Sequence, residues 1–344
     1  MNKIALPLLI IPLFIKLLFT EAHGADHNLS VLFSVSILVL SFFTVLILKM
    51  LKAGKHSAPE LMARTLTFWW MLGLFLIAVT TPTVISFILI GIFSGLAFLE
   101  YFEFQINEKN ILLPQKFIYC SLLLIPFNLG LHYFGHSRLS LGLCFLCVTL
   151  IIPSVLVLMN EVDSVLLRFG YWTSAVVFFI FALGYGAAIA AQSLLLLLFC
   201  FFFTELRDLI SYWLGKFLAK AYIRHEDSLM LKFLNLKIAD KVSPNKSWGV
   251  GFITLMILLI LAFLMRDFLP KIAGKKISAA LICAWIFSIG FFGLLGDLVF
   301  SMFKRQFGLK DSGSLLPGGT GIIDRIDSLI LTIPATYFIF FYLN

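Results

Sequence analysis

A short stretch near the end of the chain, GLLGDLVFSMFKR, carries polar side chains at helical spacing. Four of them recur at i, i+4, i+7 and i+8, so an α-helix would present all four on one face. They are Asp297, Ser301, Lys304 and Arg305. A snorkelling helix end accounts for the two cations, but not for Asp297, which lies two turns deeper among leucines. Ionisable residues at such a depth are functional as a rule, and this carboxylate is expected to meet a cation or a metal ion.

A glycine-rich stretch, PGGTG (317–321), follows this helix and leads into the last apolar segment. Such a run disfavours a helix, but its N–H groups can surround an anion. Asp324 and Asp327 come next, at i and i+3, with Arg325 between them. Carboxylates at the start of a helix can be ordinary caps. Together with Asp297 they also form a set of hard oxygen ligands, so the pattern predicts one or two divalent ions, with Mg²⁺ as the expected metal.

Two more polar segments could supply groups to the same site. TELRDLISYWLGK brings Glu205 and Asp208 to the end of a predicted helix, close to Tyr212. The segment SPNKSW offers Ser243 and Lys246 in a turn fixed by proline, and such groups can hold a phosphate. Taken alone, this last pattern is not specific.

The composition sets the class of protein that must position these residues. The chain has 344 residues, of which 61% are hydrophobic and only 13% are charged. A water-soluble fold could not cover so much apolar surface, so we expect an all-α polytopic integral membrane protein. Its net charge of +8 fits the anionic headgroups at a cytoplasmic membrane face better than nucleic acid, because no soluble basic domain is present.

A bilayer core needs about 20 apolar residues per helix, and by that measure we expect about 9–11 transmembrane helices. The candidate spans are 5–20, 30–51, 66–81, 83–102, 117–135, 139–159, 171–187, 190–206, 247–266, 277–302 and 328–343. The short segments could break at Thr81-Pro82 and at Gly184 and Gly186, and could also merge or re-enter the membrane. Residues 1–25 could be either a cleaved signal peptide or a helix, and the sequence leaves both open.

The distribution of Lys and Arg sets the expected orientation. It places the polar loops 207–246 and 303–327 in the cytoplasm. We therefore expect an inner-membrane protein with a cytoplasm-facing polar site built from its C-terminal half.

The stretch SMFKRQFGLKDSGSLLPGGTGIIDRID (301–327) closely resembles the C-terminal motif of the phosphatidate cytidylyltransferases, or CDP-diacylglycerol synthases. That motif runs S-x-hydrophobic-K-R, four residues, K-D, a P-x-H-G-G turn and a hydrophobic-x-D-R-hydrophobic-D ending. SPNKSW is similar to the family's S-P-x-K-T-W segment, and Asp208 with Tyr212 resembles its D-x-x-x-Y loop. The resemblance covers roughly residues 170 to 343. It implies a catalytic membrane domain over 166–344, preceded by transmembrane helices of unclear role over 1–165.

The resemblance implies a reaction of CTP with phosphatidate that yields CDP-diacylglycerol and pyrophosphate, with membrane lipids as partners. The catalytic residues it implies are Ser301, Lys304, Arg305, Lys310, Asp311 and Arg325. The expected nucleotide-binding residues are Asp208, Tyr212, Ser243, Asn245 and Lys246. Gly318, Gly319 and Thr320 join them because the glycine-rich stretch can surround an anion with its N–H groups. The expected Mg²⁺ ligands are the three carboxylates described above, Asp297, Asp324 and Asp327.

The chain departs from the family pattern in two places. Gly319 stands where the family has histidine and is followed by Thr320 where glycine is usual, and Gly249 replaces the glutamate that follows S-P-x-K-T-W. These departures leave open a non-catalytic lipid-binding or scaffold protein of the same fold. The acceptor could also be another lipid phosphate, such as a polyprenyl phosphate. A transporter is disfavoured, because the hydropathy shows no inverted repeat. A homodimer is compatible with all of these alternatives.

Overall fold

The computed structural model describes residues 83–103, 113–160, 164–224, 232, 234–264, 266, 277–309, 311–313 and 321–342. The predicted spans 5–20, 30–51 and 66–81 and the predicted signal segment lie outside these residues. Most of the described chain belongs to one compact unit, formed by Ile90–Ser312 and Gly321–Asn344. The predicted boundary between residues 165 and 166 falls within this unit, and a separate catalytic domain over 166–344 stays a prediction.

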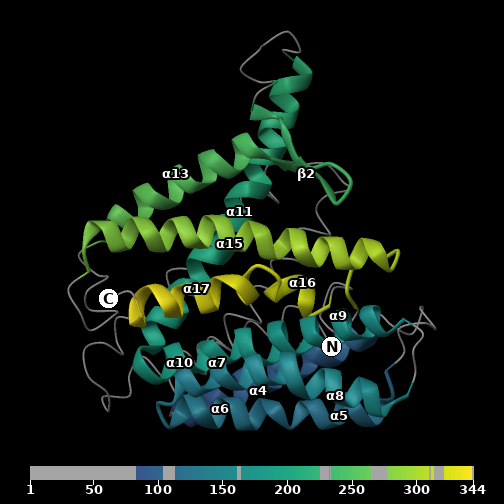
Figure 1. The fold of residues 1–344 in the computed structure, drawn as a ribbon. Coiled ribbons are helices and arrows are strands. Elements are labelled where there is room, and N and C mark those ends of the chain that lie inside the picture. Colours follow the sequence, from purple (N-terminus) through teal and green to yellow (C-terminus); the bar gives the residue numbers. More distant parts are fainter. Residues whose placement is uncertain are drawn as a thin grey trace, which may run out of the picture. The chain divides into compact units, whose positions relative to one another are not determined.

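Most of the described residues are helical, which confirms the all-α prediction (Figure 1). The helices and π-helical segments, in chain order, are α4 (Thr83–Glu103), α5 (Gln115–Leu122), α6 (Leu124–Tyr133), α7 (Ser137–Leu146), η3 (Cys147–Ile151), α8 (Ile152–Leu158), α9 (Val165–Ala175), η4 (Val176–Ala182), α10 (Leu183–Gln192), α11 (Leu194–Arg224), α13 (Trp248–Leu264), α15 (Ala279–Gln306), α16 (Ile323–Ile326) and α17 (Leu329–Phe341).

Four of the helical stretches in the described part of the chain are long and apolar enough to cross a membrane. They are Val84–Glu103, Ser137–Leu158, Val165–Gln192 and Ala279–Gln306. Each overlaps a predicted span, although Val165–Gln192 begins before the span predicted over 171–187 and reaches into the one predicted over 190–206. The chain is therefore an integral membrane protein whose spans largely follow its hydropathy.

Three helix boundaries differ from the sequence prediction. The span predicted over 117–135 is divided between α5 and α6. The break expected near Gly184 and Gly186 is wrong, because α10 continues through both glycines and ends before the extended residue Ser193. The predicted loop over 207–246 is wrong in its first part, because α11 continues to Arg224. A helix satisfies its own backbone hydrogen bonds, so it need not end where the sequence becomes polar.

The last helix, α17, lies at the centre of the unit and contacts α10, α11 and α15 (Figure 1). A line of buried hydroxyl groups joins it to α11, because Thr204 Oγ1 lies 3.2 Å from Thr332 Oγ1. Thr336 Oγ1 in turn accepts a hydrogen bond of 3.0 Å from the Trp285 indole on α15. These bonds join α11, α15 and α17, the helices that carry most of the predicted site.

Helix α4 is fixed against α9 and η4 by polar and aromatic contacts. The hydroxyl of Ser94 donates to the carbonyl of Phe179 in η4, and the hydroxyl of Tyr171 donates to the carbonyl of Tyr101. The rings of Tyr101 and Tyr171 also stack, with their centroids 4.4 Å apart. These contacts fix the end of α4 at which Glu100 lies.

A small antiparallel hairpin lies between α11 and α13. Its strands are β1 (Lys237–Ala239) and β2 (Ser243–Ser247), which pair in the register Lys237 to Ser247 and Ala239 to Ser243. Gly249 is the second residue of α13, directly after this hairpin in the sequence, and a Cβ there would collide with the backbone of Leu234. The close approach of the Leu234 backbone therefore explains why this chain has glycine at the position where the family carries glutamate.

Candidate active site

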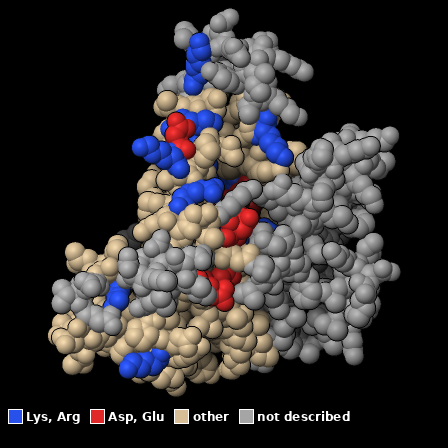
Figure 2. Space-filling view, turned by 90° about the vertical axis from the view of Figure 1, so that its right-hand side faces the viewer, with Lys and Arg blue, Asp and Glu red and all other residues tan. Residues whose placement is uncertain are grey.

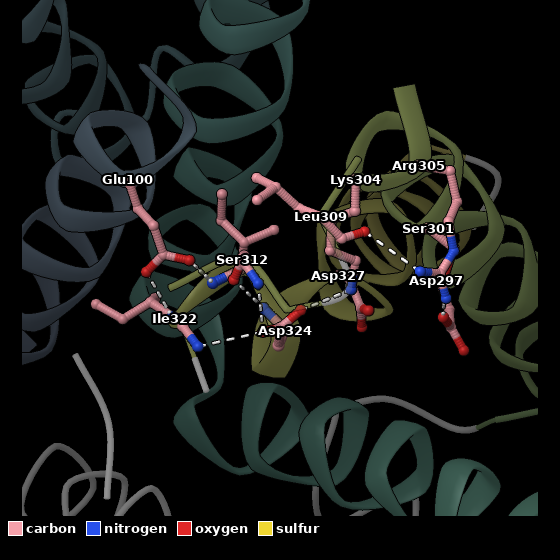
Figure 3. A network of polar contacts seen from close by, with 12 residues as sticks. Glu100, Asp297, Ser301, Lys304, Arg305, Leu309, Ser312, Ile322, Asp324 and Asp327 are labelled. Atoms are coloured by element: carbon pink, nitrogen blue, oxygen red, sulfur yellow. Dashed lines mark hydrogen bonds and ion pairs between the residues drawn. The ribbon is translucent and has the colours of Figure 1, made fainter. Parts of the chain in front are cut away.

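The site begins with an ion pair between the two predicted motifs. Lys246 on β2 forms a salt bridge with Asp297 on α15, so the SPNKSW segment meets the C-terminal motif. Ser301 donates a hydrogen bond of 3.3 Å to the same carboxylate, as its i+4 spacing predicts (Figure 3). The side chains of Asp297 and Lys246 keep 28% and 20% of their surface exposed, so the pair is only partly buried.

A second ion pair lies deeper and joins α15 to α16. Lys304 Nζ donates to Asp324 Oδ1 over 2.6 Å, and the side chains of both residues are about 90% buried. The other carboxylate oxygen of Asp324 accepts the backbone N–H groups of Ser312 and Gly321, at 2.8 and 3.2 Å (Figure 3). Asp324 therefore joins Ser312 and Gly321, nine positions apart in the sequence, to Lys304 at the end of α15.

Asp327 occupies the turn between α16 and α17 and is buried. Its carboxylate accepts the backbone N–H of Ser328 over 2.7 Å. Burial, together with the nearby carboxylates of Asp297 and Asp208, raises the pKa of Asp327 to about 8. A group of acids that raise one another's pKa is stabilised by any cation bound among them.

Arg207 on α11 supplies one such cation from inside the protein. Its guanidinium forms a salt bridge with Asp208 and donates a hydrogen bond of 2.9 Å to the hydroxyl of Ser328. It also packs against α15 at Gly293, where an added Cβ would lie 3.0 Å from the guanidinium. This buried arginine therefore connects the three helices around the acids.

The packing of α15 against the Asp327 turn depends on Gly296. A Cβ at this position would collide with the carbonyl oxygen of Asp327, because the two backbones touch there. Glycine at 296 thus lets Asp297 lie directly beside the Asp327 turn.

Replacing Gly296 with alanine should therefore force α15 and the Asp327 turn apart. Overpacking of this kind costs about 1–3 kcal/mol, so the melting temperature in detergent should fall. Gly215→Ala on α11 is the matched control, because nothing lies within 4 Å of an added Cβ there. This control should leave the melting temperature unchanged or raise it, since alanine favours a helix. Equal melting temperatures for both variants and the wild type would contradict the tight contact at Gly296.

The remaining predicted residues lie around this centre. Arg305 is exposed and donates to the carbonyl of Leu309 over 3.3 Å, so it points away from the buried Lys304. Tyr212 accepts a hydrogen bond from Lys216, whose ammonium lies 4.3 Å from the centre of its ring. Ser243 and Asn245 lie on β2, Asp311 is exposed, and Arg325 is half-buried on α16. Lys310, Gly318, Gly319 and Thr320 lie outside the described residues.

The metal ligand set stays a prediction. Carboxylate oxygens suit a hard divalent ion, and Asp297 and Asp327 lie near enough to affect each other's charge. Both oxygens of Asp324, however, already accept hydrogen bonds. In the described part of the chain no three His, Cys, Asp or Glu side chains stand close enough to hold a metal ion together.

Two residues of the site were missed from the sequence. Glu100 on α4 is 1% exposed and accepts hydrogen bonds from the backbone of residues 322 and 323. The second is Arg207, which directly precedes Asp208 in the sequence and connects α11 to Ser328. A signal for Glu100 was available, because it is a carboxylate within an apolar span, as is Asp297.

One face of the molecule shows charged side chains of both signs (Figure 2). Figure 2 shows acidic side chains gathered near the middle of that face, with basic side chains next to them. Alternating charge of this kind suits a substrate that carries both phosphates and a counter-ion.

The fold and these ion pairs define a helical membrane protein with a polar site built from two distant motifs. Residues 62–343 match the cytidylyltransferase family, and the chain belongs to this family. The match begins well before residue 170, where the motif resemblance starts, and it includes Glu100.

Individual relatives cover the chain to different extents. The phosphatidate cytidylyltransferase of Haemophilus influenzae is 42% identical over 109 residues, which are 31% of this chain and 38% of the relative. The phosphatidate cytidylyltransferase of Synechocystis sp. is 36% identical over 115 residues, which are 32% of this chain and 36% of the relative. An uncharacterised protein of Escherichia coli K12, YnbB, is 28% identical over 334 residues, which are 92% of this chain and 97% of the relative. The chain thus matches well under two thirds of the named enzymes but nearly all of YnbB.

Proposed function

We propose that this protein transfers a cytidylyl group from CTP to the phosphate of a membrane lipid, with phosphatidate as the expected acceptor. The products are then CDP-diacylglycerol and pyrophosphate. The observation that carries this proposal is the ion pair between Lys246 and Asp297. It joins the two segments that resemble the family motifs, although nothing in their local sequence requires them to meet.

The chemistry needs little acid–base catalysis. The phosphomonoester of the lipid is largely ionised near pH 7, because its second pKa is about 6. One of its oxygens attacks the α-phosphorus of CTP, a new P–O bond forms, and the bond to the β-phosphate oxygen breaks to release pyrophosphate. The main obstacle is repulsion between two anions, so positioning and charge neutralisation should dominate.

The cations of the site fit that task. Lys246, Lys304 and the exposed Arg305 supply positive charge around α15. A divalent ion held by Asp297, Asp324 and Asp327 would neutralise further phosphate charge when bound. We place the site at the cytoplasmic face of the inner membrane, where CTP is found. This chemistry is the same for a monomer and for a homodimer.

The acceptor is the finer part of the proposal and is tested by competition. Purified protein in nanodiscs would receive CTP and equal amounts of phosphatidate and a polyprenyl phosphate. We expect the CDP-lipid formed to be mainly CDP-diacylglycerol, as measured by mass spectrometry. A product formed only on the polyprenyl phosphate would support cytidylyl transfer but contradict phosphatidate as the acceptor.

We also expect the reaction to need a divalent metal ion. Mg²⁺ or Mn²⁺ should support turnover and excess EDTA should abolish it, because the acids of the site are hard oxygen ligands. Adding Mg²⁺ back should restore the rate, and Zn²⁺ should restore it poorly. Full turnover in excess EDTA would remove the metal from the proposal.

A second candidate is a lipid-binding scaffold that keeps the fold without the reaction. The observation that favours it is that Lys246 and Lys304 are both engaged by carboxylates of the protein itself. Such a scaffold would bind phosphatidate in nanodiscs but would release no pyrophosphate from CTP. Pyrophosphate release that depends on the lipid therefore separates the two candidates.

A further inference from the structure

Glu100 has no place in the motifs that define the family resemblance, yet it is among the most buried charged residues described. It is 1% exposed on α4, in the half of the chain that had no predicted role. Its Oε2 accepts the N–H of Ile322 over 2.7 Å and its Oε1 accepts the N–H of Ile323 over 3.2 Å (Figure 3). The hydroxyl of Ser312 donates to the same carboxylate.

The same short stretch of backbone is also held from its other side. Asp324 accepts the N–H groups of Ser312 and Gly321, and the hydroxyl of Ser312 lies 3.3 Å from the N–H of Asp324. We call Glu100, Ser312 and residues 321–324 the neck. The carboxylates of Glu100 and Asp324 thus hold Ser312 close to the backbone of residues 321–323.

The neck leaves no room for a side chain between its parts. A Cβ on Gly321 would collide with the carboxylate of Glu100 and the hydroxyl of Ser312. Glycine at 321 therefore lets Glu100 approach the backbone closely enough to accept its N–H groups. A buried carboxylate is costly unless its oxygens are hydrogen-bonded, and here the neck supplies the donors.

We infer that Glu100 is a positioning residue, which holds the neck so that Asp324 and Asp327 face the nucleotide phosphates. This inference rests on the proposed function, because it assigns these two acids to the CTP site. Glu100 acts through the backbone of Ile322 and Ile323 and not by contact with a substrate. Helix α4, which carries it, is thereby part of the active site although it lies outside the motifs.

The test replaces Glu100 with glutamine, which keeps the size but turns one acceptor oxygen into a donor that faces an N–H group. Hydrogen bonds to charged groups are strong, so kcat/KM for CTP should fall about 10- to 100-fold. The loss should appear mainly as a raised KM for CTP, with the KM for the lipid phosphate unchanged. The matched control is Glu103→Gln, one turn later on α4 and exposed, which should behave as the wild type.

Two further measurements separate positioning from general destabilisation. Hydrogen exchange should speed up at the amides of Ile322 and Ile323 in Glu100→Gln, but not in α13. A merely structural role would lower the fraction of active protein and leave the KM for CTP unchanged. If Glu100→Gln does not fold, Ser312→Ala removes one hydroxyl from the same neck and should raise the KM for CTP less, in the same direction.

The outcomes distinguish this inference from the proposed function. Unchanged exchange at Ile322 and Ile323 would overturn the hydrogen bonds of Glu100. Faster exchange with an unchanged KM for CTP would overturn its positioning role. A wild-type protein that forms no CDP-lipid would refute the proposed function and with it the role toward CTP, while the exchange result would still decide whether Glu100 holds the neck.

Discussion

Replacing Asp297 with asparagine is expected to lower turnover by about 10²- to 10³-fold, which is the usual cost of losing one preorganised electrostatic contact. Asparagine keeps the size of the side chain but removes the charge that pairs with Lys246 and would help to hold a divalent ion. The melting temperature in detergent should change little, because the side chains of both members of this pair are partly exposed.

The control for this variant is Asp240→Asn, an exposed acid beside the hairpin. It should keep both turnover and melting temperature. Normal turnover in Asp297→Asn would remove this residue from the reaction. A collapsed melting temperature would show that its carboxylate is instead a structural partner of Lys246.

The second large effect is expected at the buried pair of Lys304 and Asp324. Lys304→Met leaves the carboxylate of Asp324 buried without its cation, and breaking such a pair typically costs about 3–5 kcal/mol. Unfolding should therefore occur at a clearly lower temperature or denaturant concentration. Arg305→Met is the neighbouring control, because Arg305 is exposed and should contribute little to stability.

A double variant isolates the cause of that effect. Adding Asp324→Asn to Lys304→Met removes the stranded charge, so much of the stability should return. Turnover should not return, because the site has then lost both charges. A double variant no more stable than Lys304→Met would contradict the view that an unpaired buried carboxylate causes the loss.

The fold was predictable where hydropathy alone decides. The spans around α4 and α15 match the sequence prediction, because a bilayer demands long apolar helices. The course of α11 was not predictable in the same way. Its second half is polar, and the hydropathy that marks a membrane span says nothing about whether a helix continues beyond it.

The site was predictable only in its local geometry. The bond from Ser301 to Asp297 follows from i, i+4 spacing, and it is present. The partner of Asp297 was expected to be a cation or a metal ion, but no sequence rule identifies Lys246. The contact of Glu100 with Ile322 joins residues 222 positions apart, and only the packing of α4 brings them together.

The most direct test of the account follows the label of CTP itself. Purified protein in nanodiscs containing phosphatidate would be incubated with Mg²⁺ and with CTP labelled at either the α- or the γ-phosphate. We expect that α-label enters the lipid, that γ-label leaves as pyrophosphate in equal amount, and that Asp297→Asn loses both. Cytidylyl transfer would be contradicted if the lipid carried the γ-label. It would also be contradicted if correctly folded protein put no label into the lipid.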